Sequence, residues 1–295
     1  MRLSFIRVAK SLMLAVKRFP DQNGRRPLRL CAAVFAGLLA FSPSLPAVAQ
    51  TPPAAQSFEP QSGQAGKDVV WVPTSQALVE KMLDIAKVTP QDYLIDLGSG
   101  DGRTVITAAR RGLKAHGIEY EPEMVELAKR RAAEAGLADR ATFTKADLFA
   151  SDFSDAQVIT MFLLSTINEK LRPKILDLKP GTRIVSNTFK MGDWEPDQTA
   201  TVADGCTNWC TALLWIVPAK VEGSWKVDQQ DLKLTQKYQM ITGTLGAAPI
   251  SDARLDGSTI SFNVNGARYT GTVDGKTMKG SVTGGNGGSW SAART

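Results

Sequence analysis

The sequence predicts an α/β domain built on a mainly parallel sheet, followed by a small all-β domain. From Tyr93 onward, short β-type runs alternate with amphipathic helical stretches, which is the pattern of repeated βα units. From Gly223 onward, apolar and polar residues alternate instead, and turn signals such as Asp256-Gly257 and Asn265-Gly266 separate the runs. We therefore expect the second domain to be an antiparallel meander or barrel.

The elements of the first domain follow from these runs. The expected strands are residues 93–97, 114–119, 141–145, 157–161 and 182–188, with a closing antiparallel pair near 198–203 and 211–217. The expected helices are residues 103–111, 122–135 and 166–177. An extra helix over residues 75–86 precedes the first strand, with Thr74 as its expected N-cap.

The chain has 295 residues, of which 43% are hydrophobic and 22% charged, the usage of an ordinary globular protein. Its formal net charge is +6, but residues 1–49 hold eight Lys or Arg residues and one acid, Asp21. The remainder has 27 bases against 28 acids, a net of −1. The folded part therefore lacks the basic surface expected of a protein that binds nucleic acid.

Residues 1–49 read as an export signal peptide. The apolar run over residues 30–41 is too short to span a bilayer as a helix, and Ala47-Val48-Ala49 forms a cleavage site before Gln50. We expect export to a bacterial periplasm and no stable membrane span after cleavage. Arg25-Arg26 leaves open whether the general or the twin-arginine route is used.

Three further segments follow the signal. Residues 50–66 are rich in Pro, Gln and Ala without apolar periodicity, which predicts a flexible linker. The α/β domain is expected over residues 67–222, and residues 50–222 carry a net charge of −4. The β domain is expected over residues 223–295, with a net charge of +3.

A glycine-rich loop at the end of the first expected strand is the strongest functional signal. It reads Asp96-Leu-Gly-Ser-Gly-Asp-Gly-Arg103 and leads directly into a helix, whose N-terminus offers free N–H groups and a positive dipole. The spacing differs from the dinucleotide pattern G-x-G-x-x-G and from the phosphate loop G-x-x-x-x-G-K-[ST].

Two more acids end the next two strands. Glu119 ends the second strand, where a carboxylate can accept the hydroxyls of a ribose, and Asp147 follows the third strand. Because parallel strands carry their carboxyl ends to one edge of the sheet, we expect Asp96, Glu119 and Asp147 to line one crevice.

Together these residues resemble a class I S-adenosylmethionine-dependent methyltransferase with a Rossmann-like seven-strand sheet. The resemblance implies S-adenosyl-L-methionine as the cofactor. It implies that Asp96 lies near the methionine part, that Glu119 binds the ribose and that Asp147 binds the adenine. The resemblance implies that Gly98, Gly100 and Gly102 form the floor of the cofactor site and that Ser99 also binds the cofactor. A Rossmann-type domain for another nucleotide is the alternative.

The flanking segments resemble the lysine methyltransferases related to the ATP synthase c-subunit enzyme. These segments are Trp71-Val-Pro-Thr74, DLGSGDGRTVITAA, Gly117-Ile-Glu-Tyr120 and Asp193-Trp-Glu-Pro-Asp197. The chain departs from that family in its export signal, in Cys206 to Cys210 and in the β domain. The resemblance implies N-methylation of a protein lysine.

The expected acceptor residues are Trp194, Asp193 and Phe162. Trp71 and Trp194 are candidates for aromatic walls of an acceptor channel, Asp193 for orienting an ammonium, and Phe162 for a contact at the end of the fourth strand. Plain packing is the alternative for each aromatic residue, and it is favoured for Trp71.

The remaining reactive residues are few. The single histidine, His116, lies inside the second strand and is expected to be structural, and no metal site is predicted. Cys206 and Cys210 form a local disulfide if a turn brings their α-carbons within about 7 Å.

The expected function is methyl transfer from S-adenosyl-L-methionine to a protein lysine by in-line attack, with no metal or covalent enzyme intermediate. Three alternatives remain open: an exported protein with a cofactor-binding fold but no turnover, a cell-envelope interaction protein acting through its β domain, and a methyltransferase for a small molecule. The supply of cofactor outside the cytosol is the main difficulty for an exported enzyme.

Overall fold

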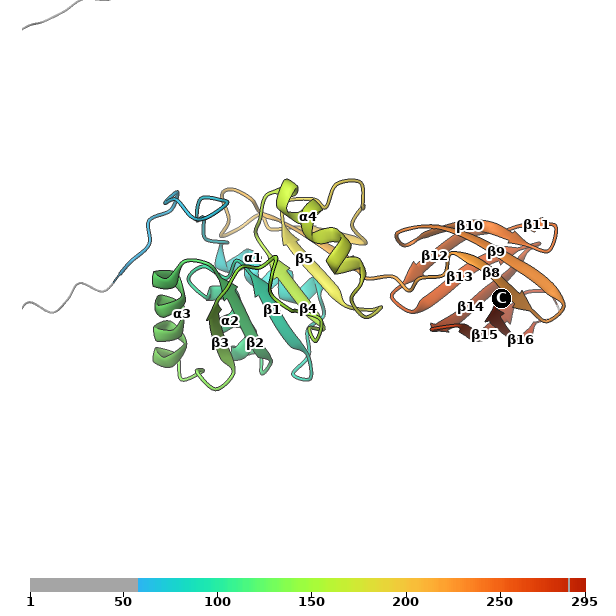
Figure 1. Ribbon diagram of the computed structural model, residues 1–295, viewed down its shortest axis with the longest axis horizontal. Helices are drawn as coiled ribbons and strands as arrows, with labels where there is room; N and C mark the ends of the chain where they lie inside the picture. The colour runs from blue at the N-terminus through green and yellow to red at the C-terminus, as the bar shows by residue number, and fades with distance from the viewer. Residues whose placement is uncertain (1–57, 286) are drawn as a thin grey trace, which may run out of the picture. The chain divides into compact units, whose positions relative to one another are not determined.

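The computed structural model describes residues 58–285 and 287–295 (Figure 1). The expected signal peptide, residues 1–49, lies outside the described residues, as does the first part of the expected linker. Within the described part of the chain, none of the helices has the length and apolar content needed to cross a bilayer.

The first domain contains a seven-stranded sheet in the order β3-β2-β1-β4-β5-β7-β6. Strands β1 to β5 pair in parallel, and β7 pairs antiparallel with both β5 and β6. The strands are β1 Tyr93–Leu97, β2 Lys114–Glu119, β3 Ala141–Lys145, β4 Val158–Met161, β5 Arg183–Asn187, β6 Gln198–Thr201 and β7 Thr211–Ile216. The predicted seven-strand α/β fold is confirmed.

Helices supply the apolar residues that cover both faces of this sheet. One apolar cluster joins the sheet to α1 Gln76–Ile85, α2 Arg103–Arg110 and α3 Pro122–Glu134, and a second joins it to α4 Ser165–Leu176. Strand β1 contributes Leu94 to the first cluster and Ile95 to the second, because successive side chains of a strand point to opposite faces. The three β-strand ends that carry the predicted acids therefore emerge between two buried layers.

The first helix begins one residue later than expected. The N-cap of α1 is Ser75, whose Oγ accepts a hydrogen bond from the Leu78 backbone N–H at 3.3 Å. The hydroxyl oxygen of Thr74 instead accepts from Asn187 Nδ2 at 3.3 Å. Two adjacent hydroxyl residues both have the chemistry of an N-cap, and the long-range partner of Thr74 decides between them.

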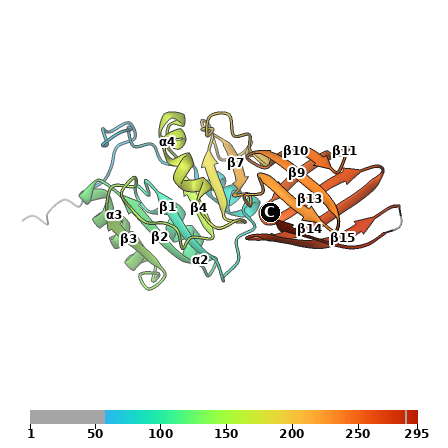
Figure 2. The ribbon, with the colours of Figure 1, turned by 45° about the vertical axis from the view of Figure 1, so that its right-hand side comes forward.

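The second domain is a closed antiparallel barrel. The chain runs through β8 Gly223–Val227, β9 Gln230–Lys237, β10 Met240–Leu245, β11 Ala248–Pro249, β12 Ser251–Asp256, β13 Thr259–Val264, β14 Ala267–Asp274, β15 Thr277–Thr283 and β16 Gly288–Arg294. Pairing of β10 with β9 closes the sheet, and the two-residue β11 pairs only with β10 (Figure 2). Asn265 and Gly266 have φ values of 48° and 79°, as a tight hairpin turn requires.

The two domains share a buried contact around Trp194. The Trp194 indole N–H donates to Gln239 Oε1 at 2.8 Å, and its ring stacks on Tyr238 with a centroid distance of 5.5 Å. Gln239 Nε2 in turn donates to the Glu195 carbonyl at 2.9 Å. Tyr238 and Gln239 form the turn between β9 and β10, so the barrel covers a tryptophan of the first domain.

Candidate active site

A cavity opens where the carboxyl ends of β1, β2, β3 and β4 meet. It has about 1080 Å³ of empty volume, part of it open to solvent. Its lining includes Asp96, Gly98, Ser99, Gly100, Glu119, Asp147 and Phe162. The structure therefore brings together the three strand-end acids, most of the glycine loop and one predicted acceptor residue.

Backbone hydrogen bonds hold the glycine loop against the second strand. The N–H groups of Gly98 and Ser99 both donate to the Ile118 carbonyl, at 2.9 and 3.1 Å. Gly100 has a φ of 51°, and a Cβ there would lie 2.6 Å from the indole nitrogen of Trp71. The loop can approach Trp71 this closely only because residue 100 is glycine.

Gly102 does not belong to the cavity floor, contrary to the prediction. It is absent from the cavity lining and is the N-cap of α2, with a φ of 80°. A Cβ at this position would lie 2.7 Å from Phe143 and 2.8 Å from Ala128. Gly102 thus permits close packing of the loop onto α3 and β3, a requirement that the spacing of glycines alone does not reveal.

Asp96 is a buried carboxyl at the end of β1. Its Oδ1 accepts a hydrogen bond of 2.6 Å from the Thr160 hydroxyl, and its residue is only 6% exposed. Burial raises the pKa of Asp96 to about 7; the charges of Glu119 and Asp101 act in the same direction, and hydrogen bonding from Thr160 opposes it. A cationic group bound beside this carboxyl would favour its charged form.

Glu119 ties β2 to the glycine loop. Its Oε2 accepts from the Gly100 N–H at 2.8 Å, and its Oε1 accepts from the N–H groups of Tyr120 and Glu121 at 2.8 and 3.0 Å. An ionised carboxylate offers about four acceptor positions, so about one remains, on Oε2. Glu119 is therefore oriented in advance to accept one further hydrogen bond within the cavity.

Asp147 follows β3, lines the cavity and forms an ion pair with Lys67. Lys67 Nζ is 2.7 Å from Asp147 Oδ2 and lies 4.6 Å from the centroid of the Tyr120 ring. The hydrogen bond from Lys67 and a second one from the Phe149 N–H hold the pKa of Asp147 below its usual value. Asp147 is thus ionised and already has a cationic partner from the N-terminal segment.

That segment, residues 58–74, covers one side of the cavity. It folds back on itself through hydrogen bonds from the Gly63 N–H to the Trp71 carbonyl, at 2.8 Å, and from the Trp71 N–H to the Gln64 carbonyl, at 2.9 Å. Residues 64–66 line the cavity. The composition predicts a linker for residues 58–66. These residues show no apolar periodicity because they form neither a helix nor a strand. Contacts with the glycine loop and with α3 hold them in place instead.

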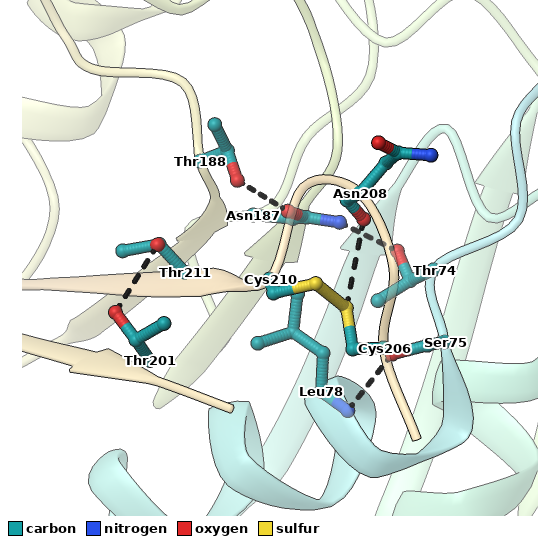
Figure 3. Close-up of a disulfide and its surroundings, with 10 residues drawn as sticks. All are labelled: Thr74, Ser75, Leu78, Asn187, Thr188, Thr201, Cys206, Asn208, Cys210 and Thr211. Atoms are coloured by element: carbon teal, nitrogen blue, oxygen red, sulfur yellow. Dashed lines mark hydrogen bonds between the residues drawn. A yellow bond between two sulfur atoms is a disulfide. The ribbon is translucent and has the colours of Figure 1, made fainter. Parts of the chain in front are cut away.

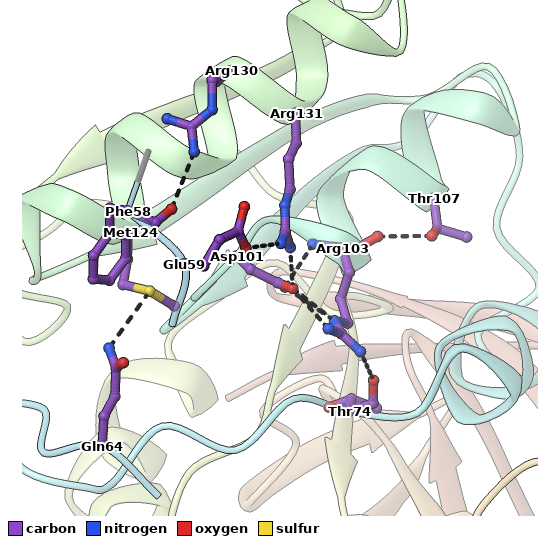
Figure 4. A network of polar contacts seen from close by, with 10 residues as sticks. All are labelled: Phe58, Glu59, Gln64, Thr74, Asp101, Arg103, Thr107, Met124, Arg130 and Arg131. Atoms are coloured by element: carbon purple, nitrogen blue, oxygen red, sulfur yellow. Dashed lines mark hydrogen bonds and ion pairs between the residues drawn. The ribbon is translucent and has the colours of Figure 1, made fainter. Parts of the chain in front are cut away.

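Asp101 anchors this arrangement (Figure 4). Its carboxylate is 2.7 Å from Arg103 Nη2 and 2.5 Å from Arg131 Nη1, while Arg103 Nη1 donates to the Thr74 carbonyl at 2.8 Å. Burial disfavours the charge of Asp101, but hydrogen bonding and charge from Arg103 and the charge of Arg131 outweigh it and lower its pKa. The sequence analysis predicts no role for Asp101. The signal that could have indicated one is an acid between two glycines, two residues before Arg103.

Trp194 and Asp193 are not acceptor residues of this cavity, so that prediction was wrong. Trp194 is fully buried, is absent from the cavity lining and contacts the barrel. Asp193 forms ion pairs with Arg172 at 2.8 Å and Lys237 at 3.0 Å, and its other partner is the Tyr238 hydroxyl at 2.7 Å. Both residues connect the two domains. Phe162 does line the cavity, and so does Trp71.

The disulfide between Cys206 and Cys210, which the sequence left open, is present (Figure 3). The two α-carbons are 5.7 Å apart, within the expected limit. Cys206 Sγ also lies 3.5 Å from the Asn208 carbonyl oxygen, which is a contact rather than a hydrogen bond because a disulfide sulfur carries no proton. His116 Nδ1 is 2.8 Å from the Thr142 hydroxyl on the neighbouring strand, a position that agrees with a structural role.

The cavity fits a ligand that joins an amino acid to a nucleoside. Ser99 Oγ is buried without a hydrogen-bond partner among the described residues, in a space that Gly117 leaves free, since a Cβ there would lie 2.5 Å away. Asp96 offers a site for an ammonium, and Glu119 and Asp147 offer acceptors for hydroxyl and amino groups. The polar groups that face a ligand here are the carboxylate oxygens at the strand ends, because the N–H groups of Gly98, Ser99 and Gly100 already donate to Ile118 and Glu119.

A parallel sheet with two antiparallel closing strands and such a cavity at its carboxyl edge defines a class I methyltransferase. A family described as the ANTKMT methyltransferase domain matches residues 96–198. The chain is 43% identical, over 152 residues, to a protein-lysine N-methyltransferase of Saccharolobus islandicus, an alignment that covers 50% of this chain and 94% of the relative. The chain belongs to this methyltransferase family, and its methyl donor is S-adenosyl-L-methionine.

Two further proteins show similarity to this chain. The ATP synthase c-subunit lysine N-methyltransferase of Mus musculus is 33% identical over 130 residues, which are 44% of this chain and 52% of the relative, so the chain spans about half of that relative. A solved structure of an RNA methyltransferase from Salinibacter ruber, in complex with S-adenosyl-L-homocysteine, is 45% identical; the match covers 51% of this chain and 96% of that one, with a TM-score of 0.48.

Proposed function

We propose that this protein transfers a methyl group to the side-chain nitrogen of a lysine in another protein. The observation that carries this proposal is the 43% identity to a protein-lysine N-methyltransferase over 94% of that relative's length. The aromatic wall at Phe162 and the net charge of −4 over residues 50–222 support a cationic guest with an apolar stem.

The cofactor residues have distinct parts in this proposal. S-adenosyl-L-methionine supplies, when bound, an electrophilic methyl group on a sulfonium. Asp96 pairs with the ammonium of the bound amino acid, Glu119 accepts one ribose hydroxyl, and Asp147 accepts from the adenine amino group. The N-terminal segment, residues 58–74, reduces the access of water to these contacts.

The acceptor must arrive as a neutral amine, because an ammonium has no lone pair for attack. Contact with Phe162 and Trp71 removes water from the lysine side chain, which lowers its pKa and favours loss of its proton to solvent. In the transfer itself a nitrogen–carbon bond forms as the sulfur–carbon bond breaks, and the positive charge passes from sulfur to nitrogen. The chain's contribution to the rate is orientation of the two reactants.

We further propose that the protein acts in a bacterial periplasm. The basic and apolar pattern of residues 1–49 supports export, and the Cys206–Cys210 disulfide supports an oxidising compartment. An enzyme exported already folded can carry a bound cofactor with it. Recovery of protein beginning at Gln50 from the periplasmic fraction would support this location, and recovery of the intact chain from the cytosol would overturn it.

Label transfer tests the proposed acceptor. The purified protein is incubated with S-adenosyl-L-methionine labelled in its methyl group and with an envelope protein extract, and the products are hydrolysed to amino acids. We expect the label in methylated lysine. Label in lipid or nucleic acid with none in lysine would refute the acceptor while leaving the methyltransferase assignment intact.

The matched control is Glu119→Ala, which removes a cofactor contact outside the acceptor wall. This variant should lower transfer in proportion to its loss of affinity for S-adenosyl-L-homocysteine. Transfer that persists unchanged in Glu119→Ala would show that a contaminating enzyme produced the label.

A further inference from the structure

Three aromatic side chains from separate segments gather beside the cavity. Phe162 follows β4, Phe189 follows β5, and Trp209 lies in the loop between β6 and β7. The Phe162 ring centroid is 5.9 Å from that of Phe189 and 6.0 Å from that of Trp209. Phe162 lines the cavity and Trp209 is 44% exposed, so this aromatic cluster extends from the cavity wall to solvent.

The backbone of the aromatic cluster is strained at two places. Trp209 has a φ of 54°, and Thr188, directly before Phe189, has a φ of 60°. A residue with a bulky or branched side chain in this left-handed region costs about 1 to 2 kcal/mol. Such conformations persist where the surrounding structure imposes them, and they are concentrated at functional sites.

Several contacts impose the conformation of the Trp209 loop. The Cys206–Cys210 disulfide, drawn in Figure 3, closes the turn that contains Trp209. The Val202 N–H donates to the Cys210 carbonyl at 2.9 Å. A Cβ on Gly205 would lie 3.3 Å from Ala77, so the loop rests on the first turn of α1. The disulfide and the contact with α1 therefore restrict the conformation of the loop that carries Trp209.

A separate set of bonds holds Phe189. The buried Asn168 of α4 donates from Nδ2 to the Phe189 carbonyl at 3.1 Å, and the Ser186 hydroxyl donates to the same carbonyl at 2.8 Å. The Thr188 N–H donates to the Thr211 carbonyl at 2.7 Å, which joins this segment to the strand after the disulfide. The backbone at Phe189 is thus held by α4, by Ser186 of β5 and by the strand that follows the disulfide loop.

The charge of the loop favours a cation. Residues 202–210 read VADGCTNWC, with Asp204 as their single charged residue. An indole face attracts a Lys ammonium within about 6 Å of the ring centroid, and two phenyl rings can pack along its four-carbon stem. The aromatic cluster therefore matches a lysine side chain that enters the cavity from solvent.

We propose that the aromatic cluster of Phe162, Phe189 and Trp209 is the entrance for the acceptor lysine, and that the Cys206–Cys210 disulfide holds Trp209 in its receiving position. This proposal rests on lysine methylation as the proposed function. It gives the disulfide loop a role in recognition of the acceptor. In the sequence this loop is visible only as a departure from related enzymes. Oxidation of the two cysteines then becomes a condition for efficient acceptor binding.

A binding experiment tests the entrance without requiring turnover. The full chain, labelled with ¹⁵N at its tryptophan indoles and saturated with S-adenosyl-L-homocysteine, is titrated with N-acetyl-lysine amide. The Trp209 indole signal is identified by its loss in Trp209→Phe. We expect that signal to shift saturably, with binding about fivefold weaker for N-acetyl-norleucine amide, which has the stem without the charge. No shift at 100 mM probe, or equal binding of the two probes, would overturn the proposal.

Kinetics then separates recognition from cofactor binding. Trp209→Ala should raise the KM for a lysine acceptor about fivefold to thirtyfold and leave the dissociation constant of S-adenosyl-L-homocysteine within twofold, whereas Trp209→Phe should retain most affinity. Met240→Ala, which removes an exposed apolar side chain from the barrel, is the matched control and should change neither constant. An unchanged KM in Trp209→Ala, or an equal loss of cofactor affinity, would refute the proposal.

The disulfide is tested by Cys206→Ser. This variant should reproduce a large part of the KM increase of Trp209→Ala and reduce the shift of the Trp209 signal, while cofactor affinity stays within twofold. Wild-type behaviour of Cys206→Ser would refute the role of the disulfide. If the wild-type chain fails to bind S-adenosyl-L-homocysteine at all, the proposed function itself fails, which is a different result from failure of the entrance.

Discussion

The raised pKa of Asp96 makes a direct prediction for Asp96→Asn. In the unfolded chain this carboxyl ionises near 3.8, and in the folded protein near 7. Because the pKa of Asp96 is higher in the folded protein, ionisation of this carboxyl lowers the unfolding free energy. The loss is negligible well below pH 3.8 and grows with pH until the pH has passed about 7. The full difference corresponds to about 4 kcal/mol of unfolding free energy.

Asn keeps the acceptor for the Thr160 hydroxyl and cannot ionise. The unfolding free energy of Asp96→Asn minus that of the wild type should therefore rise by up to about 4 kcal/mol between pH 4 and pH 8. Any cost of fitting the amide is the same at every pH and cancels in this comparison. Urea unfolding of the ligand-free proteins, followed by circular dichroism and tryptophan fluorescence, measures the difference.

Asp139→Asn supplies the control, because the Asp139 side chain is 76% exposed. Its difference from the wild type should stay nearly constant over the same pH range. A flat profile for Asp96→Asn as well would refute the conclusion that burial raises the pKa of Asp96 far above its usual value. The same variant should bind S-adenosyl-L-homocysteine more weakly, because its amide cannot neutralise an ammonium.

Three further outcomes are expected. Glu119→Ala should weaken binding of S-adenosyl-L-homocysteine about tenfold to a hundredfold by calorimetry, since one hydrogen bond to a charged acceptor is lost; unchanged affinity would contradict the assignment. Asp101→Asn should lower the unfolding free energy at pH 7 by about 2 to 4 kcal/mol, because Arg103 and Arg131 lose their partner, and the loss should shrink below pH 4 as the wild-type carboxyl protonates. Gln239→Leu should lower stability by about 1 to 3 kcal/mol and leave cofactor affinity within twofold; a large loss of affinity would return Trp194 to the active site.

Elements governed by local pattern were predictable from the sequence. The first three strands, residues 93–97, 114–119 and 141–145, have the expected bounds. The first is largely apolar and buried, and the other two carry buried residues such as Ile118 and Phe143 among more exposed polar ones. The three strand-end acids meet because parallel strands deliver their carboxyl ends to one edge. That part of the site follows from topology alone, without knowledge of any side-chain contact.

The remainder depends on contacts between distant segments, which a local pattern does not contain. Trp194 is an aromatic residue of the kind that could line an acceptor channel. Only its contacts with the turn at Tyr238 and Gln239, more than 40 residues later, show that it packs against the barrel instead. Lys67 lies in a stretch without periodicity and gains its role from Asp147. Gly100 and Gly102 are distinguished by the side chains that contact them, which are Trp71 at Gly100 and Phe143 and Ala128 at Gly102.

The contact around Trp194 also decides how this chain can be divided. In the relative from Saccharolobus islandicus, 152 aligned residues account for 94% of the protein, so the methyltransferase fold there is nearly the whole molecule. Here a tryptophan of that fold is completely buried, with its indole N–H bonded to Gln239 and its ring stacked on Tyr238 of the barrel. A recombinant fragment that ends at residue 222 would expose this indole to water and leave its N–H without that acceptor. In this protein the methyltransferase fold and the barrel therefore belong to one compact unit.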